Sequence, residues 1–245
     1  MKKRKIEIVI PVYNEEKELI ANITTLQKFC AEYLHSYDWH ITIVDNASND
    51  STKEKSATLV KKLSGVGYHY LSQKGRGRAV KYIWKHTSAD YYAYMDVDLS
   101  SDLTHLPNLF RALEEGFDIS VGSRLKKGAR VEGRTFIREL TSRVLNMLFI
   151  QLFFHTSFTD AQCGFKAVSK KVVENLIPHV EDNGWFFDSE LLILAEKSGY
   201  KIYEEPIHWV DNPGSTVRLV STIWGDIEVI VRLLRTRPWN NVVKQ

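Results

Sequence analysis

Two aspartates one residue apart, Asp96 and Asp98, follow the apolar run from Tyr91 to Met95. The run is typical of a buried strand, so both carboxylates stand where that strand ends. A buried, uncompensated carboxylate is costly and therefore meets a divalent cation, a basic side chain or water. Mg²⁺ or Mn²⁺ binds a couple of carboxylate oxygens and leaves room for phosphate oxygens. Alone, the pair is more often a solvated turn with helix-capping acids, so its surroundings decide between that turn and a metal-assisted nucleotide diphosphate site.

Alternating strands and helices are expected to position these acids. Hydrophobic periodicity predicts one Rossmann-like α/β domain with a mainly parallel central sheet flanked by helices, because helices regularly separate the strands. The predicted strands are 6–10, 40–44, 66–71, 91–95 and 118–121, and the predicted helices are 19–33, 51–63, 77–87 and 106–115.

A polar segment follows each of the five predicted strands. Any one of them is explained by a turn or a helix cap. In a parallel sheet, however, the carboxyl ends of the strands share one edge, where ligands bind. Five polar segments on that edge predict a shared nucleotide site: 11–16, 45–50, 74–78, 96–98 and 122–124.

The sequence narrows the kind of nucleotide site. It has neither the Gly-x-Gly-x-x-Gly of a dinucleotide fold after its first strand nor a P-loop. Lys74 and the arginines of the 75–78 stretch open a helix whose amino terminus is expected to favour anions. We therefore expect Asp96 and Asp98 to hold a metal, the metal to hold a diphosphate, and the second-strand acids to face the base or ribose.

Composition excludes other classes of function. A net charge of +3 over 245 residues is too small to indicate nucleic-acid binding. The cysteines, Cys30 and Cys163, fit no metal spacing and no disulfide framework, which favours a reducing, cytoplasmic compartment. The longest apolar stretch, 144–158, is interrupted by polar residues and predicts a buried or interfacial helix instead of a membrane span.

Nearly the whole chain resembles glycosyltransferase family 2, the inverting nucleotide-sugar transferases with a single GT-A domain. Residues 10–15 match the opening of the family, 44–50 its base-binding segment and 95–99 its metal site. Within the family, the chain is most similar to the dolichyl- or polyprenyl-phosphate sugar synthases. The segments that carry this closer resemblance are 122–124 with Arg138, 160–166 and 185–191.

The resemblance implies a nucleotide-sugar-binding half at 1–124, an acceptor half at 125–215 and a C-terminal amphipathic helix at 216–245. It implies Mg²⁺ or Mn²⁺ on Asp96 and Asp98, and UDP-glucose or GDP-mannose as the donor. Asn46 departs from the family, because many members have a second aspartate there. The expected donor-binding residues are Pro11, Tyr13, Asn14, Glu15, Asp45, Asn46, Lys74, Arg78, Asp96, Val97 and Asp98.

Catalysis is expected to involve Asp98, Arg124, Arg138 and Asp188, and Arg218 is a further candidate. A polyprenyl phosphate acceptor is already ionised, so the arginines and the metal would stabilise charge while direct displacement inverts the sugar. A hydroxyl acceptor needs a base, and the resemblance favours Asp188 for that role. Asp188 is equally well explained as a helix cap, and the neighbouring Glu190 as a solvated helix acid.

Two amphipathic stretches, 144–158 and 219–234, suggest how the chain meets a lipid acceptor. The second carries basic residues and is expected either to lie on an anionic membrane or to pack against the sheet or a second subunit of a homodimer. The expected protein is thus a hexosyltransferase peripheral to the cytoplasmic membrane face. The alternatives are a hydroxyl-acceptor transferase of cell-surface polysaccharide or glycolipid synthesis, and a non-catalytic sugar-nucleotide-binding subunit attached through a membrane partner.

Overall fold

The computed structural model describes residues 3–133, 150–210 and 219–242. Its central sheet has seven strands in the order β3-β2-β1-β4-β7-β5-β8 and is mostly parallel, which confirms the predicted fold class. A second, two-stranded sheet pairs β6 (Arg130–Glu132) with β9 (His208–Val210). The strands of the central sheet are β1 (Lys5–Val12), β2 (Asp38–Asn46), β3 (Val66–Leu71), β4 (Tyr91–Met95), β5 (Ile119–Ser123), β7 (Phe165–Ser169) and β8 (Ile202–Pro206).

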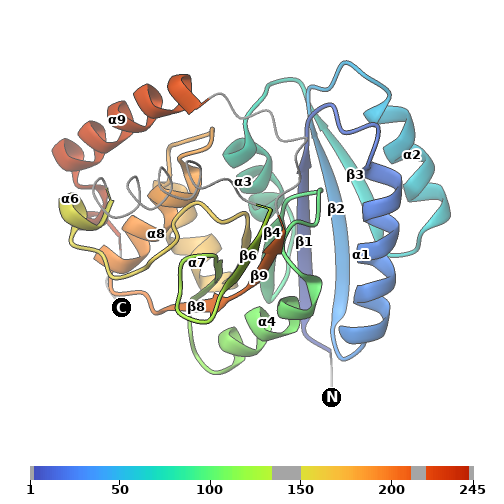
Figure 1. Ribbon diagram of the computed structural model, residues 1–245, viewed down its shortest axis with the longest axis horizontal. Coiled ribbons are helices and arrows are strands. Elements are labelled where there is room, and N and C mark those ends of the chain that lie inside the picture. Colours follow the sequence, from blue (N-terminus) through green and yellow to red (C-terminus); the bar gives the residue numbers. More distant parts are fainter. Residues whose placement is uncertain (1–2, 134–149, 211–218, 243–245) are drawn as a thin grey trace.

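Helices flank the central sheet, and their bounds agree closely with those predicted up to residue 115 (Figure 1). Helix α1 buries Leu19, Ile23, Leu26 and Cys30, whereas Tyr33 at its end is exposed. The helices are α1 (Leu19–Tyr33), α2 (Thr52–Lys62), α3 (Arg76–His86), α4 (Leu106–Glu114), α6 (Leu152–Phe154), α7 (Lys170–Asn175), α8 (Phe187–Lys197) and α9 (Leu219–Thr236), with 3₁₀ turns at Leu103–His105, Ile177–His179 and Pro238–Asn240.

Strand β7 runs antiparallel to both of its neighbours, β4 and β5. Its first residue, Phe165, pairs with Met95, the last residue of β4. The segment before β7 therefore reaches the same sheet edge as Asp96. The backbone N–H of Asp96 donates to the carbonyl oxygen of Gly164 at 3.2 Å, which fixes the two segments to one another.

The predicted amphipathic stretches are only partly within the described residues. Residues 144–149 lie outside them, and the helix in the rest of the first stretch ends at Phe154, because His155 adopts a left-handed backbone with φ 49°. Helix α9 buries Ile230 and Leu233 in the core. Within the described ranges, no helix has the length and apolarity needed to cross a bilayer.

Candidate active site

Backbone strain is concentrated where the strands end. Asn14, Ala47 and Leu99 have positive φ values of 56°, 63° and 52°, and they follow β1, β2 and β4 respectively. A left-handed backbone is unfavourable for residues other than glycine and persists where surrounding contacts enforce it. The carboxyl edge of the sheet is therefore held in a specific shape by the residues around it.

Hydrogen bonds join the loops after β1 and β2. The N–H of Asn14 donates to Ser48 Oγ, and the N–H of Asn49 donates to Asn14 Oδ1, both at 2.9 Å. The N–H of Glu15 donates to Thr52 Oγ1, also at 2.9 Å. The side chain of Asn14, expected at the donor, thus links the two loops.

Asp45 and Asn46 end β2 and are both buried. The oxygens of Asp45 accept from the Ser48 N–H at 2.8 Å and from the Tyr68 hydroxyl at 3.0 Å. The amide nitrogen of Asn46 donates to the carbonyl of Val12 at 3.3 Å. Its Oδ1 is buried and has no partner among the described residues, so it offers an unused acceptor to a donor group of a base or ribose.

Tyr13, Lys74 and Arg78 meet beside these loops. The Lys74 ammonium lies 3.8 Å from the centre of the Tyr13 ring and donates to the Tyr13 hydroxyl. Arg78 Nη1 donates to the carbonyl oxygen of Lys74 at 2.6 Å. Pro11 lies in β1 and is half-buried. An exposed aromatic ring next to a cation is suited to stacking on a base and attracting phosphate.

Asp96 and Asp98 lie at the end of β4, on either side of the buried Val97. Asp96 Oδ1 is 2.9 Å from Arg76 Nη2, and Asp98 Oδ1 accepts from the Ser100 N–H at 3.0 Å. Next to both acids is a hollow of about 10 Å³, which is close to the space that one water molecule needs. Its lining residues are Met95, Asp96, Asp98, Leu99, Ser100, Ser101, Gly164 and Trp209.

The negative charge of this edge fits a divalent cation. Burial and, to a smaller extent, acidic neighbours that include Asp98 and Asp96 together raise the pKa of Glu15 to about 7. Burial also raises the pKa of Asp96, against the opposing effect of Arg76. Within the described ranges, no three acidic, histidine or cysteine side chains form a complete metal site. The protein thus supplies a two-carboxylate site that water and phosphate oxygens would complete.

Arg124 is held by Asp160 through a bidentate ion pair. Its Nε and Nη2 donate to the two carboxylate oxygens at 2.7 and 2.9 Å, and its backbone N–H donates to Oδ2 at 3.0 Å. Asp160 is fully buried, and Arg124 lowers its pKa. Arg124 therefore fixes the 160–164 segment beside Asp96. Arg138 and Arg218 lie outside the described residues.

Asp188 is 1% exposed and pairs with Lys166, which is fully buried, at 2.8 Å. Burial raises the pKa of Asp188 to about 7 and lowers that of Lys166 to about 7. Their mutual contact favours the charged form of each. Lys166 also donates to the carbonyls of Cys163 and Ala161 at 2.5 and 3.0 Å. Because Phe186 is the N-cap residue of α8, Asp188 is inside the helix and does not cap it.

Glu190 differs from the solvated helix acid that the sequence suggested. It is fully buried and accepts from the backbone N–H of Glu181 and Asp182 at 3.2 and 2.7 Å. Arg232 of α9 donates to it at 2.8 Å. Glu190 therefore anchors α9 and the 181–182 loop onto α8.

The amino terminus of α3 also differs from the expectation of an open anion site. The N–H groups of Gly77 and Arg78 donate to the carbonyls of Gly184 and Asn183 at 3.2 and 3.1 Å. A Cβ on Gly77 would lie 2.5 Å from that of Phe187, so the helix end is packed tightly against this loop. Charge at this end comes from the Arg76 side chain, because the amides are already used.

Sequence reasoning missed the structural roles of Arg76, Asp160, Gly164 and Lys166. A Cβ on Gly164 would lie 2.0 Å from Arg76 Nη2 and 2.1 Å from Asp96 Oδ2, so only glycine fits there. The quoted segments contained all four residues, but no local pattern revealed that an antiparallel strand brings 160–164 to Asp96.

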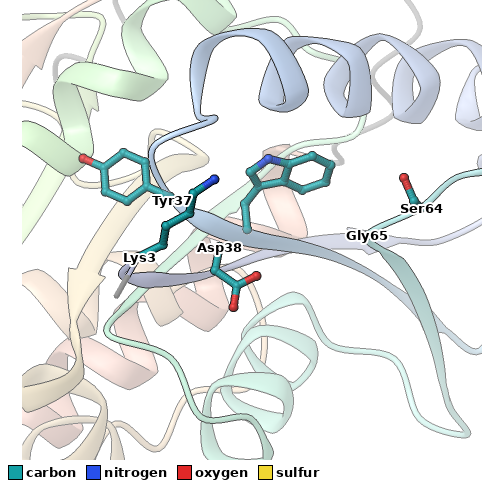
Figure 2. A pocket seen from close by; sticks show the side chains of 6 residues that line it. Lys3, Tyr37, Asp38, Ser64 and Gly65 are labelled. Atoms are coloured by element: carbon teal, nitrogen blue, oxygen red, sulfur yellow. The ribbon is translucent and has the colours of Figure 1, made fainter. Parts of the chain in front are cut away.

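A larger cavity, of about 420 Å³, lies at the opposite, amino edge of the sheet (Figure 2). Trp39 and Asp38 begin β2 and line it together with Lys3, Tyr37, Ser64 and Gly65. It lacks the paired carboxylates and strained loops of the carboxyl edge. The candidate site is therefore identified by its side chains and backbone geometry, and not by the size of the cavity.

The chain is similar to known proteins over most of its length. Residues 7–177 match the model of Glycosyl transferase family 2. Over 229 residues the chain is 31% identical to Glycosyltransferase AglD of Haloferax volcanii, covering 93% of this chain and 36% of that protein. It is 28% identical to Dolichyl-phosphate beta-glucosyltransferase of Saccharomyces cerevisiae, covering 87% of this chain and 69% of the relative. Identity to Dolichol-phosphate mannosyltransferase of Pyrococcus furiosus is 31%, covering 94% and 64% respectively.

The fold is similar to that of glucosyl-3-phosphoglycerate synthase from Mycobacterium tuberculosis. Its complex with UDP has a TM-score of 0.68 at 18% identity and covers 96% of this chain and 80% of that one. The complex of the same protein with Mn²⁺, UDP-glucose and phosphoglyceric acid has a TM-score of 0.67 at 17% identity, covering 96% and 80%. At this identity the likeness shows the GT-A fold alone. The chain spans about a third to two thirds of the length of the curated relatives above.

Proposed function

Because the chain belongs to glycosyl transferase family 2, we propose that it transfers a hexose from a nucleoside diphosphate sugar to a polyprenyl phosphate, with inversion. The observation that carries this proposal is the carboxylate pair Asp96 and Asp98 beside the small hollow at the sheet edge. Two curated relatives named as dolichyl-phosphate or dolichol-phosphate transferases, a glucosyltransferase and a mannosyltransferase, support the acceptor class.

The donor would lie across the loops after β1, β2 and β3. The free acceptor oxygen of Asn46 would receive a donor group of the base or ribose. Tyr13 and Lys74 would cover the base side, with Arg78 fixing Lys74 through its carbonyl. Pro11, Asn14, Glu15 and Asp45 would shape this surface. UDP-glucose is the proposed donor, with GDP-mannose as the alternative.

Asp96 and Asp98 would hold Mg²⁺ or Mn²⁺ through their carboxylate oxygens. Such a cation, when bound, neutralises charge that develops on a leaving diphosphate. Asp160 orients Arg124, which we propose as a cation for the phosphates together with Arg138.

The acceptor is proposed to be a phosphate because the one residue expected to serve as a base is not accessible to an acceptor. Asp188, the residue expected to serve as one, is sealed from solvent and paired with Lys166. A general base must come within hydrogen-bond reach of the proton that it takes. A phosphate oxygen is already ionised and attacks without this help. We therefore propose a positioning role for Asp188.

A lipid acceptor implies that the protein works at a membrane surface. We propose that it is peripheral to the cytoplasmic membrane face, directly or through a membrane partner. The amphipathic helix α9 supports this placement, although part of its apolar stripe is buried against the rest of the protein. The alternative is that the same surface of α9 forms the interface of a homodimer.

The test is a donor screen with purified protein and Mn²⁺. UDP-glucose and GDP-mannose are each offered with a polyprenyl phosphate, with a sugar hydroxyl or with phosphoglyceric acid, and products are identified by mass. We expect transfer to the polyprenyl phosphate and an inverted anomeric configuration. Transfer only to a hydroxyl would overturn the acceptor, and donor binding without turnover would indicate the non-catalytic subunit.

The carboxylate pair is tested in the same assay. Asp96→Asn and Asp98→Asn should each lower turnover at least about a hundredfold, because cation stabilisation is worth several kcal/mol. Asp38→Asn changes an exposed aspartate at the opposite edge and should leave turnover unchanged. Undiminished turnover in the presence of a chelator would remove the metal role.

A further inference from the structure

Arg76 is buried against the carboxylate pair, and its placement is unusual. Its side chain is 10% exposed and its Nη2 lies 2.9 Å from Asp96 Oδ1. The guanidinium carbon is 5.3 Å from the centre of the Tyr94 ring and 5.1 Å from that of Trp185. Arg76 therefore lies close to two aromatic rings and next to the acid that is proposed to bind a cation.

The contact with Asp96 leaves much of the guanidinium unused. Neither Nε nor Nη2 makes a well-angled hydrogen bond among the described residues, although both are buried. A buried donor without a partner is unfavourable, because it has lost its hydrogen bonds to water. By contrast, Arg124 donates through both Nε and Nη2 to the carboxylate of Asp160. The geometry of Arg76 thus suits a side chain that can exchange one partner for another. That of Arg124 suits a side chain held in one position by Asp160.

The carboxylate oxygens of Asp96 cannot bind both Arg76 and a divalent cation strongly at the same time. A divalent ion on Asp96 and Asp98 would compete with Arg76 for Asp96 and would repel it. A diphosphate bound to that ion would lie within one ligand shell of Asp96, and so within reach of the guanidinium. The planar fork of arginine is suited to phosphate oxygens.

We propose that Arg76 is a resident counter-ion of Asp96 that is displaced by the divalent cation and then contacts the diphosphate of the donor. This inference rests on the proposed function, because it needs the cation and the nucleotide. It assigns to Arg76 a positioning role toward the metal and a binding role toward the donor. Gly164 permits the exchange, since any Cβ there would fill the space shared by Arg76 and Asp96.

The test is a pair of titrations on Arg76→Gln that are expected to change in opposite directions. Without nucleotide, Mn²⁺ should bind at least about tenfold more tightly than to the wild type, because a neighbouring like charge is removed. With saturating Mn²⁺, UDP should bind at least about tenfold more weakly, because a charge-assisted contact is lost. Arg111→Gln, on the exposed face of α4, should change neither affinity.

Thermal unfolding is measured alongside to show that the variants are folded. If Arg76→Gln does not fold, Arg76→Met replaces it, with the same directions, because it also removes the charge. Unchanged affinities, or losses in both titrations, would overturn the inference while leaving the proposed function standing if the wild type still transfers sugar. A wild type that binds neither Mn²⁺ nor UDP would overturn both.

Discussion

The charged residues of the site fall into two groups, namely buried ion pairs and half-buried acids. Arg124 with Asp160 and Lys166 with Asp188 are enclosed pairs that hold the 160–166 segment. Removing one member of a buried pair is strongly destabilising, because the other charge remains without compensation. Asp96 and Asp98 differ, since each is only half-buried and next to a hollow. Chemistry is therefore expected at these two acids, and stability at the pair of Lys166 with Asp188, while Arg124 keeps the phosphate-binding role proposed above.

Asp188→Asn separates these two roles. We expect it to lower the free energy of unfolding by about 3–5 kcal/mol, because Lys166 is left buried without its anionic partner. Turnover of the folded fraction on polyprenyl phosphate should fall less than about tenfold, since an ionised acceptor needs no base. The measurements are denaturant unfolding and initial rates at saturating donor and metal.

The control for Asp188→Asn is Glu174→Gln, which breaks the exposed pair with Lys170 and should cost below about 1 kcal/mol. A thousandfold loss of turnover in Asp188→Asn with UDP affinity preserved would contradict the phosphate acceptor. It would identify Asp188 as a base for a hydroxyl.

Asp96 and Asp98 were predictable because a local pattern, two acids after an apolar run, identifies them. The ion pair of Asp96 with Arg76 was not, because the partners are on different elements and meet only in the folded sheet. The environment of Asp188 was likewise not predictable from a local sequence pattern. Its residue type favoured a base or a cap, while its burial beside Lys166 depends on how α8 packs onto β7.

Among the elements, β7 matters most for the shape of the site. It runs antiparallel to β4, and this direction places Gly164, just before the strand, against Asp96. Alternation of strands and helices predicted the five parallel strands through residue 121 but gave no sign of a strand inserted between β4 and β5. Strand order depends on long-range pairing, which periodicity does not encode. The contribution of the 160–164 segment to the site follows from that order alone.

Gly164→Ala tests the close approach of this element. The added Cβ would lie 2.1 Å from Asp96 Oδ2, so Asp96 or the segment must move. We expect at least about a hundredfold loss of turnover, since a displacement of about 1 Å costs that much in a positioned site. Gly225→Ala, in α9 with no atom within 4 Å of the new Cβ, is the matched control and should retain full turnover. Normal rates in Gly164→Ala would show that the segment is not part of the site.

Helix α9 also places a carboxylate in an unfavourable position. Asp226 is buried, and its Oδ2 has no hydrogen-bond partner among the described residues. Burial and, to a smaller extent, the charge of Asp182 together raise its pKa to about 7. Because the folded-state pKa lies above the unfolded one, stability is lost as the pH rises from about 4 to 7, and the loss is complete above that range.

Asp226→Asn should therefore stabilise the protein at pH 8 by about 2–4 kcal/mol and have little effect at pH 4. The amide keeps the shape of the side chain and removes the charge that burial disfavours. Thermal unfolding of both proteins at the two pH values measures this difference. An equal effect at both values would show that the charge of Asp226 is not what destabilises the fold.

At the scale of the whole molecule, two parts of the chain are joined around α3. Lys81 of α3 donates to the carbonyls of Val180 and Glu181 at 2.9 and 3.1 Å, and Arg232 of α9 contacts Glu181 and Glu190. The donor loops and α9 are thus connected through the same 180–190 region. A lipid acceptor bound near α9 would be positioned relative to the sheet edge by this connection.

The exposed apolar side chains of this end give the proposed membrane contact a test. Leu152 of α6 is exposed, as are Val231 and Leu234 of α9. The two helices lie at the same end of the molecule, where Phe154 packs against Trp239 at 6.1 Å between ring centres (Figure 1). Burying such side chains in the lipid interface is worth about 1.5–3 kcal/mol each when complete.

The double variant Val231→Glu and Leu234→Glu should therefore bind anionic vesicles at least about tenfold more weakly than the wild type, measured by co-sedimentation. Its turnover on a short, water-soluble polyprenyl phosphate should be unchanged, because neither residue touches the sheet edge. A control with Val60→Glu, exposed on α2, should bind vesicles like the wild type. If the double variant binds vesicles normally but a concentration-dependent dimer is lost, α9 joins two copies of this chain, and membrane contact must come from a different surface.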